Sequence, residues 1–463
     1  MKYLIELVSY ENQELIERLD VNKDELKFII DKLYAKNIIK MNNGRIQFLY
    51  VGIAIVKNKP IFVLPKYINS LEEDKQKKHF KKIVELLNVF TSREKLDENS
   101  IGSISNNNET EENEFLSIIK FILDDYSEYG LYKNEIESVE LNGNGDIDWN
   151  QTINQIDPLV FNNQWIYTDF ITNKSIIDEN KFITLLHGSI INECITLLQK
   201  YHLNLFFDCN EEFIENTLDN FDEEDVEGLE NQIDKEIVIQ FNDRKRRVLY
   251  AIKSYLNKRS GIEDVDVILF GTRNYKWVWE VVCGYVFDNE FVNKGRKSKY
   301  EVFGITSPKW IIGGNNMQAP GASDLEIKKN RLTPDILKTV FSPQGNKLLI
   351  LDAKYYNIKF DIENKKVLGN PGIEDITKQY LYKTALKSYI KDNNIDDDVI
   401  NAFLFPIMDK TNVQGVVKLD FMDEHCQSGI KLVMLNAEEV IEMYCNNKRY
   451  DIIKFIELVN KEK

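Results

Sequence analysis

The segment that most constrains the fold is residues 331–356, where two apolar, strand-forming runs carry acidic and basic residues. A turn with Pro and Gly separates the runs, so a β-hairpin is predicted. Side chains alternate along a strand, so Asp352 and Lys354 of the second run project from the same face. In a suitable register, Asp335 of the first run lies beside them. The sequence therefore predicts that two carboxylates and one ammonium meet at the edge of an apolar sheet.

Such a group of side chains suits the hydrolysis of phosphodiesters. Mg²⁺ prefers oxygen ligands and usually binds only one or two carboxylates, keeping water molecules for the reaction. The metal polarises a phosphoryl oxygen and lowers the pKa of a bound water. A lysine can orient that water or help to deprotonate it, and can stabilise developing negative charge. The alternative is a salt-bridged surface hairpin, because an Asp-x-Lys pattern is common by chance.

Pro334-Asp335, followed by the Asp-Ala-Lys triplet at 352–354, resembles the motif of the PD-(D/E)XK nuclease superfamily. The resemblance implies a C-terminal nuclease core with the element order αβββαβ. It also implies a Mg²⁺ site, in which Mn²⁺ can substitute, held by Asp335, Asp352 and the backbone carbonyl of Ala353. Lys354 is then expected to activate or position the attacking water.

A mostly apolar helix is predicted at residues 276–287, and Glu280 lies among its apolar residues. A buried carboxylate needs a partner, which a metal ion or the active-site lysine can supply; the alternative is a partly exposed Glu at the helix edge. In PD-(D/E)XK nucleases an early helix offers such a Glu to the metal site. A later helix of these nucleases often carries a Gln or Tyr near the scissile phosphate. This resemblance makes Gln379 and Tyr380 of the predicted helix at 373–390 auxiliary candidates.

Further segments complete the predicted nuclease core. Strands are expected at 303–313, 399–408 and 430–435, and a largely helical segment at 437–458. A basic loop before the first of these strands contains Arg296, Lys297 and Lys299. These three side chains are expected to contact the DNA backbone; the alternative is a disordered loop tip.

The first part of the chain is predicted to contain two short helices within residues 15–33, followed by a hairpin with an Asn-Asn-Gly turn at 42–44. This order resembles a winged helix, which can contact DNA or serve only protein interaction or structure. A β-rich region follows and ends in Leu-Pro-Lys-Tyr at 64–67. This ending resembles a recurrent feature of LlaJI-type restriction endonucleases.

A second stretch, Gly-x-Ile-x-Trp-x-x-Thr-Ile at residues 145–153, resembles McrC, the nuclease subunit of McrBC restriction systems, and its LlaJI relatives. Trp149 within it is interpreted as a packing anchor. The resemblance to this group, which includes components of BsuMI-type systems, covers most of the chain and implies a McrB-like AAA+ GTPase partner. The sequence has no GxxxxGK[ST] motif, so a nucleotide-driven motor has to be a separate chain.

Length and charge limit the organisation of the chain. Its 463 residues suggest two or three domains. We predict a winged-helix-like and β-rich region at 1–98, a middle region at 99–236 and the nuclease domain at 237–463. The formal net charge is −16, which is unusual for a DNA-binding protein, but residues 211–236 hold twelve carboxylates against one lysine. A local basic stripe is therefore compatible with the net charge.

The five cysteines are scattered and show no metal-binding spacing, and neither a secretory signal nor a long apolar run is present. These features predict a reduced cytoplasmic protein that does not span a membrane. The sequence as a whole predicts an α+β or α/β multidomain protein. Its predicted function is that of a Mg²⁺-dependent endonuclease subunit of a restriction system, which defends against phages by cutting double-stranded DNA. The alternatives are a non-catalytic DNA-binding or assembly subunit, and a nuclease of nucleic-acid repair.

Overall fold

The computed structural model describes residues 2–68, 72–97, 114–133, 135–162, 164–177, 182–207, 212–218, 226–259, 267–291, 309–310, 325–326, 332–342, 345–361, 363–364, 366–395, 399–419 and 429–461. The chain forms two compact units. Unit 1 comprises Met1–Glu111 and Leu269–Lys463, and unit 2 comprises Glu112–Ile268. Both units contain helices and small sheets, which confirms the predicted mixed α/β, multidomain class.

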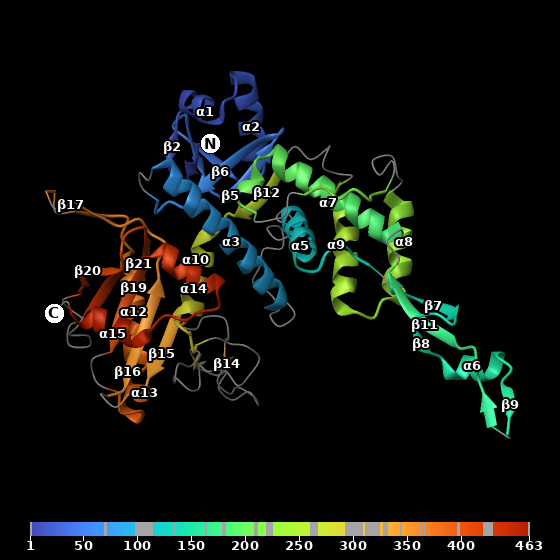
Figure 1. Ribbon diagram of the computed structural model, residues 1–463. Coiled ribbons are helices and arrows are strands. Elements are labelled where there is room, and N and C mark those ends of the chain that lie inside the picture. The colour runs from blue at the N-terminus through green and yellow to red at the C-terminus, as the bar shows by residue number, and fades with distance from the viewer. Residues whose placement is uncertain are drawn as a thin grey trace, which may run out of the picture. The chain divides into compact units, whose positions relative to one another are not determined.

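The N-terminal part of unit 1 contains helices and two small sheets (Figure 1). Its elements are β1 (Leu4–Ile5), β2 (Ser9–Tyr10), α1 (Asn12–Leu19), α2 (Lys23–Ala35), β3 (Ile39–Asn42), β4 (Arg45–Phe48), β5 (Val51–Val56), β6 (Lys59–Leu64) and α3 (Glu73–Asp97). A capping box starts α2, because Asn22 accepts a hydrogen bond from the Glu25 N–H and the Glu25 carboxylate accepts one from the Asn22 N–H. The predicted order of two helices followed by a hairpin is present as α1, α2 and the antiparallel pair β3–β4.

The C-terminal part of unit 1 contains the segment singled out by the sequence. Its elements are β12 (Val267–Thr272), which begins at the boundary with unit 2, α10 (Tyr275–Val286), β13 (Lys309–Trp310), β14 (Leu325–Glu326), β15 (Ile336–Val340), β16 (Lys347–Ala353), β17 (Lys359–Asp361), β18 (Lys366–Leu368), α12 (Ile373–Ala385), α13 (Lys387–Asp392), β19 (Ile400–Ile407), β20 (Asn412–Val417), β21 (Ile430–Asn436), α14 (Ala437–Cys445) and α15 (Ile452–Lys461).

Two glycines allow the N-terminal and C-terminal parts of unit 1 to share a sheet. The strands pair in the order β1-β6-β5-β12, so the strand that leads into α10 joins strands from the start of the chain. A Cβ atom at Gly52 of β5 would lie 2.2 Å from the carbonyl oxygen of Phe270, and one at Gly271 would lie 2.2 Å from that of Val51. Any larger residue would therefore push β5 and β12 apart.

The predicted hairpin lies at one edge of a five-stranded sheet with the order β15-β16-β19-β21-β20. Strands β15 and β16 are antiparallel, β16, β19 and β21 run parallel to one another, and β20 pairs antiparallel with β21. Strand β16 reads Lys-Leu-Leu-Ile-Leu-Asp-Ala and is buried after its first residue, as expected of a parallel strand covered on both faces. Helices α10 and α12 both contact β16.

One face of this sheet packs against α12 and α13. Leu348 and Ile350 of β16 belong to the same buried cluster as Tyr382 and Leu386. Because alternate residues of a strand share a face, Asp352 and Lys354 continue the line of Leu348 and Ile350 towards α12. The end of β16 and the residue that follows it therefore place two charged side chains within an otherwise apolar interior.

The first strand predicted for the nuclease core, at 303–313, lies largely outside the described residues. Its described part, β13, pairs with β14 and is separate from the five-stranded sheet. The other predicted strands correspond to β19 and β21, and the segment at 437–458 forms two helices, α14 and α15. Arg296, Lys297 and Lys299 lie outside the described residues.

Unit 2 consists of helices and a β-containing arm (Figure 1). Its helices are α5 (Glu114–Tyr129), α7 (Phe182–Lys200), the 3₁₀ helix η1 (Leu203–Leu205), α8 (Val226–Ile239) and α9 (Asp243–Arg259). The arm, residues 135–177, contains β7 (Glu135–Leu141), β8 (Asp146–Ile147), α6 (Trp149–Gln155), β9 (Leu159–Phe161), β10 (Gln164–Ile166) and β11 (Ile171–Ile177). Trp149 is 53% exposed and packs edge-on against the ring of Phe170, so the expected packing anchor makes a local contact at the surface of the arm.

Two features of unit 2 bear on the predicted organisation. Helix α7 is long and apolar enough to cross a membrane, but most of it is buried within the protein, as in a core helix. The predicted boundary at residues 236–237 falls inside α8, where Leu229 and Ile233 are buried and α9 packs alongside. Part of the acidic stretch at 211–236 is therefore a packed helix, and the division at 1–98, 99–236 and 237–463 does not coincide with the two compact units.

Candidate active site

The register of the hairpin brings the two aspartates of the candidate site together. Ile336 of β15 lies opposite Leu351 of β16, so Asp335, one residue before β15, lies across from Asp352. The backbone N–H of Ala353 donates a hydrogen bond of 3.0 Å to Oδ2 of Asp335. In an extended strand the N–H and C=O of one residue point to the same side, so the carbonyl of Ala353 is also directed towards the side of Asp335.

Lys354 follows β16 and is held between two carboxylates. Its backbone N–H donates to the carbonyl of Leu404 on β19 at 2.9 Å, which extends the β16–β19 ladder by one residue. Its Nζ lies 2.6 Å from Oδ2 of Asp352 and donates to Oδ1 of Asp375 at 3.0 Å. Asp352 and Lys354 are each only 6% exposed. Two charges this deeply buried need each other, because an unpaired charge in such a place is costly.

The pKa of Lys354 follows from this enclosure. Burial lowers the pKa of an ammonium, but the charges and hydrogen bonds of Asp352 and Asp375 outweigh burial and raise the pKa of Lys354 above its usual value. Lys354 is therefore a firmly protonated cation. It can position a ligand and stabilise negative charge, whereas taking up a proton from water is not available to it in this state.

The pKa values of the two aspartates indicate that they share a proton. Burial, then the negative charges of Asp352 and Glu280, raise the pKa of Asp335 to about 8. Burial also raises the pKa of Asp352, opposed by the Lys354 ammonium and by a hydrogen bond from the Asp335 carboxyl. Two carboxylates this close cannot both ionise readily without an additional cation. At neutral pH the pair therefore holds a proton in the absence of metal.

This arrangement fits a divalent cation in one respect and lacks a complete ligand set in another. Oδ2 of Asp352 is buried, and the Lys354 ammonium, 2.6 Å away, occupies only one side of this oxygen, so the oxygen keeps acceptor capacity for a cation. Within the described part of the chain, no three carboxylate, imidazole or thiolate groups gather as a metal-binding cluster. Since Mg²⁺ usually binds only one or two protein carboxylates, Asp335 and Asp352 can supply that number.

Glu280 lies on α10 near this pair but has a partner of its own. Its carboxylate is partly buried and lies 3.6 Å from the ammonium of Lys276, one turn earlier on the helix. Burial raises the pKa of Glu280; Lys276 opposes the rise, and the charge of Asp352 adds to it. The charge of Glu280 is thus felt at the aspartates, but the structure does not bring it into contact with Lys354.

The two auxiliary candidates on α12 have different surroundings. Gln379 is fully buried, and neither atom of its side-chain amide has a hydrogen-bond partner among the described residues. It lies one turn after Asp375 on the same helical face. The ring of Tyr380 packs with Phe403 in a buried cluster, and its hydroxyl accepts a hydrogen bond from the N–H of Leu419. Gln379 therefore has unused polar atoms, whereas Tyr380 is engaged in packing.

Sequence reasoning missed two residues that the fold brings to the site. Asp375 binds Lys354, and Tyr382 donates a hydrogen bond of 3.0 Å to the carbonyl of Thr333, two residues before Asp335. Burial, then the charges of Asp352 and Asp335, raise the pKa of Tyr382. The spacing of positions 375, 379 and 382 follows one face of a helix and was the available signal.

Comparisons with known proteins place these features in context. Residues 50–438 match the family model described as LlaJI restriction endonuclease. A curated relative, the type II restriction enzyme BsuMI component YdjA of Bacillus subtilis (strain 168), is 31% identical over 482 aligned positions, which cover 100% of this chain and 94% of the relative.

Two solved structures are distantly similar. One is a half-complex from a tetradecameric assembly of Thermococcus gammatolerans McrB AAA+ hexamers with bound McrC, with a TM-score of 0.40, 13% identity and coverage of 96% of this chain and 99% of that chain. The other is the McrBC complex of the same organism, with a TM-score of 0.22, 15% identity and coverage of 54% and 79%. At these values the likeness is too weak to support an inference about function.

Proposed function

Because the chain belongs to the LlaJI restriction endonuclease family, we propose that it is a Mg²⁺-dependent DNA endonuclease subunit of a restriction system. The family predicted from the sequence is confirmed by the match over residues 50–438 and by the 31% identical relative. The relative is named a component of a type II restriction enzyme, and this name supports a role within an assembly. The phage-defence role, the DNA substrate and a cytoplasmic location are part of the same proposal.

One observation carries the proposal: Asp335, Asp352 and Lys354 converge at the end of a buried hairpin. Two nearby buried carboxylates are poorly placed for stability alone, since burial raises the pKa of both and the charge of Asp352 raises that of Asp335 further. Strongly perturbed carboxyl groups beside a fixed ammonium are typical of catalytic sites. The order α10, β15, β16, α12, β19 supports a PD-(D/E)XK core, in which the predicted first strand falls mainly outside the described residues.

The proposed roles follow from the geometry. Asp335 and Asp352 would hold a Mg²⁺ ion, or Mn²⁺ in its place, with the carbonyl of Ala353 as a further ligand and Glu280 close by. When bound, the metal supplies Lewis-acid stabilisation of the phosphoryl group and a more acidic water. Lys354, fixed by Asp375, positions the attacking water and stabilises the negative charge that develops on the phosphate. Gln379 is an auxiliary candidate for contact with the scissile phosphate, and Tyr380 is a weaker one.

Nicking of supercoiled plasmid tests the proposal. The purified chain, alone and with its AAA+ partner, is expected to convert supercoiled plasmid to nicked or linear DNA when Mg²⁺ is present. Excess EDTA should stop the reaction, and Mn²⁺ should restore it. DNA binding without cleavage under all of these conditions would instead support the alternative, a non-catalytic DNA-binding or assembly subunit.

The N-terminal helices and hairpin are proposed to form a winged-helix-like module. Helix α2 carries both acidic and basic residues, and α1 and α2 precede the β3–β4 hairpin as in such modules. A mixed charge suits protein contact as well as DNA contact. Replacing the basic residues of the segment and measuring DNA affinity distinguishes DNA contact from protein contact.

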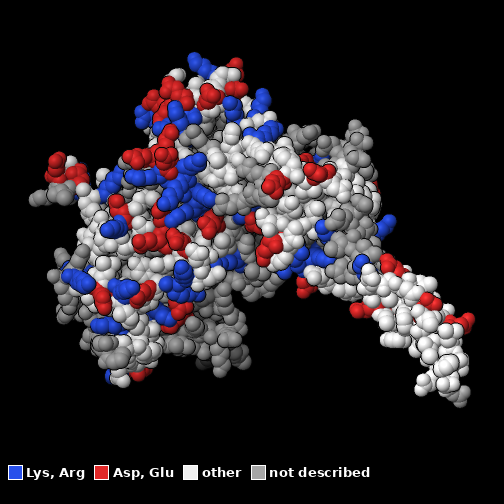
Figure 2. Space-filling view, viewed as in Figure 1, with Lys and Arg blue, Asp and Glu red and all other residues white. Residues whose placement is uncertain are grey.

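We also propose a McrB-like AAA+ GTPase as partner, bound through the part of the chain before the acidic stretch. The arm exposes apolar side chains at its outer strands, among them Phe161 and Trp165, of which Trp165 is 70% exposed. Figure 2 shows mostly uncharged atoms along this arm. Large exposed apolar groups mark surfaces that are covered by another protein.

The double variant Phe161→Ser, Trp165→Ser should weaken binding of the partner at least about tenfold, because aromatic anchors dominate interface energies. Partner-stimulated DNA cleavage should fall in parallel, while Mg²⁺-dependent activity of the chain alone should not change. Phe241→Ser is the matched control, since Phe241 is also strongly exposed in unit 2 but lies outside the arm. Pull-down and light scattering measure the association; an unchanged affinity in the double variant would exclude the arm as the docking surface.

A further inference from the structure

The Leu-Pro-Lys-Tyr motif at 64–67 has no role in the site described so far, yet it packs directly against the segment that follows Lys354. The backbone N–H of Lys66 donates to the hydroxyl of Tyr355 at 3.1 Å. The side-chain amide of Asn357 donates to the carbonyl of Lys66 at 3.2 Å. The turn at 64–67 is thus hydrogen-bonded to Tyr355 and Asn357, which lie just after Lys354 and the end of β16.

A buried carboxylate reinforces this junction. Glu6 accepts a short hydrogen bond from the hydroxyl of Tyr355 and a second, of 3.4 Å, from the N–H of Lys66. Burial raises the pKa of Glu6, while the hydrogen bond from Tyr355 opposes the rise. The Glu6 side chain therefore fixes the backbone of Lys66 relative to Tyr355, which is the neighbour of Lys354 in sequence.

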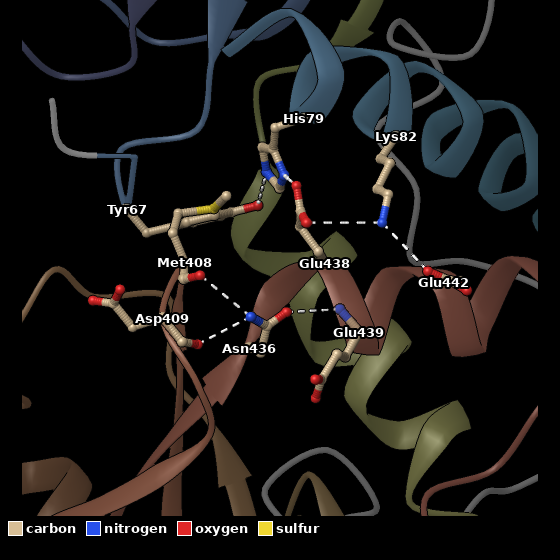
Figure 3. A network of polar contacts seen from close by, with 9 residues as sticks. All are labelled: Tyr67, His79, Lys82, Met408, Asp409, Asn436, Glu438, Glu439 and Glu442. Atoms are coloured by element: carbon tan, nitrogen blue, oxygen red, sulfur yellow. Dashed lines mark hydrogen bonds and ion pairs between the residues drawn. The ribbon is translucent and has the colours of Figure 1, made fainter. Parts of the chain in front are cut away.

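Aromatic packing and a second polar network hold the same turn from the other side. The ring of Tyr67 contacts those of Tyr355 and Tyr275, with centroids 6.2 Å and 6.4 Å apart. Figure 3 shows the hydroxyl of Tyr67 beside Nε2 of His79 on α3, 2.9 Å away, and Nδ1 of His79 beside Glu438 on α14. Contacts on both sides of the turn hold its backbone in place, so the position of the Cα atom of Lys66 is fixed.

The ammonium of Lys66 lies over two aromatic faces without a carboxylate partner. Its Nζ is 4.4 Å from the ring centroid of Tyr355 and 5.8 Å from that of Tyr356. Among the described residues, no carboxylate lies within ion-pair distance of it. Burial lowers the pKa of Lys66; Glu6 opposes this effect, and the positive charge of Lys276 on α10 adds to it.

Lys66 lies against Tyr355, the residue that directly follows Lys354 of the candidate site. Lys276 is paired with Glu280, whereas Lys66 is held by cation–π contacts that leave its N–H donors available. A partly buried cation without a carboxylate partner is an unfavourable arrangement, and an anion bound beside it would relieve it. The anion that belongs at a phosphodiesterase site is a backbone phosphate of the substrate.

We propose that Lys66 binds a backbone phosphate of the DNA strand that enters the candidate active site, next to the phosphodiester that is cut. The proposal rests on the proposed function and adds to it a substrate-positioning residue supplied by the N-terminal part of the chain. Lysine suits this role because its ammonium is a compact point charge with several donors. A phosphate contact fixes the register of the strand and carries no sequence information.

The test measures DNA affinity and its salt dependence in an Asp352→Asn background, which is expected to bind DNA without cutting it. A short fluorescein-labelled duplex is titrated at several salt concentrations. Lys66→Met should weaken binding about threefold to tenfold and reduce the slope of log K against log salt by about 0.9, the value for one lost phosphate contact. Lys66→Arg should recover most of both quantities. Lys59→Met, at the half-buried start of β6, where the ammonium donates to the carbonyl of Asp20, is the matched control and should change neither.

The outcomes separate this proposal from the proposed function. A lower affinity with an unchanged salt slope would mean that Lys66 acts only through folding, and would overturn the proposal. An unchanged affinity would overturn it too, as would an absence of DNA binding by the Asp352→Asn parent. If wild-type chain with partner cuts DNA in an Asp352-dependent way while Lys66→Met binds normally, the nuclease proposal stands and only the role of Lys66 fails. If Lys66→Met shows the expected loss but no cleavage is found, the reverse holds.

Discussion

Replacing Asp352 with asparagine, or Lys354 with methionine, is expected to reduce Mg²⁺-dependent DNA cleavage by at least about a thousandfold. Asp352→Asn removes one of the two proposed metal-ligating carboxylates, and Lys354→Met removes the cation that faces the phosphate; losses of this order follow when a single preorganised electrostatic group is deleted. Both variants keep the approximate size of the side chain. Initial rates of plasmid nicking by purified protein measure the effect.

The two variants differ in their expected stability, and this difference serves as a control on folding. Lys354→Met leaves Asp352 and Asp375 without their shared partner in a buried place, which should cost roughly 3–5 kcal/mol. Asp352→Asn leaves Lys354 bound to Asp375 and should be tolerated much better. A folded but inactive Asp352→Asn protein therefore carries the argument. Full cleavage by that variant would rule out the catalytic assignment of the hairpin.

Lys338→Met is a control from the same hairpin. Lys338 on β15 binds Asp288 and Glu290 and is largely covered, but it lies away from the convergence of Asp335 and Asp352. Its replacement should lower stability somewhat and leave the cleavage rate of the folded fraction unchanged. A parallel loss of cleavage in Lys338→Met would point to general disruption of the hairpin.

Asp335→Asn is expected to make the metal-free protein more stable than wild type at pH 8 and to abolish cleavage. The folded-state pKa of Asp335 is raised from its ordinary 3.8 to about 8. Between about pH 4 and pH 8 the unfolded chain has lost this proton while the folded chain keeps it. The contribution of Asp335 to stability is therefore fully present below about pH 4 and is lost as the pH rises through about 8.

Asparagine imitates the protonated aspartate. Its amide can donate to Asp352 and its oxygen can accept from the N–H of Ala353, so the hydrogen bonds remain without the charge. The difference in unfolding free energy between Asp335→Asn and wild type should grow as pH rises from 5 to 8, to at least about 1 kcal/mol. Urea unfolding in EDTA at several pH values measures it.

Magnesium provides the complementary measurement. Mg²⁺ should stabilise wild-type protein at pH 8, because a ligand that binds only the folded state shifts the unfolding equilibrium. It should have little effect on Asp335→Asn. Identical pH profiles for the two proteins, together with equal responses to Mg²⁺, would contradict both the shared proton and the metal site.

Local patterns were sufficient for much of the fold that surrounds the site. The period of two in residues 348–354 placed Asp352 and Lys354 on one face, and the apolar periodicity located α7, α10 and β19. These predictions succeeded because the spacing of apolar residues reports which face of one element is buried. The same reasoning missed β20, which pairs with β21, and the ion pair between Lys354 and Asp375. Both depend on contacts between two elements, which the spacing of apolar residues within one element does not report.

The sequence by itself determined the family, the hairpin and the types of side chain available for phosphodiester chemistry, because these depend on motifs and on periodicity over a few residues. Only the tertiary structure decided that Asp335 faces Asp352, that Asp375 encloses Lys354, and that Glu6 and Lys66 lie against Tyr355, some 289 residues after Lys66 in the chain. Strand register and contacts between distant segments arise from how whole faces pack together, and that information is spread over the chain as a whole.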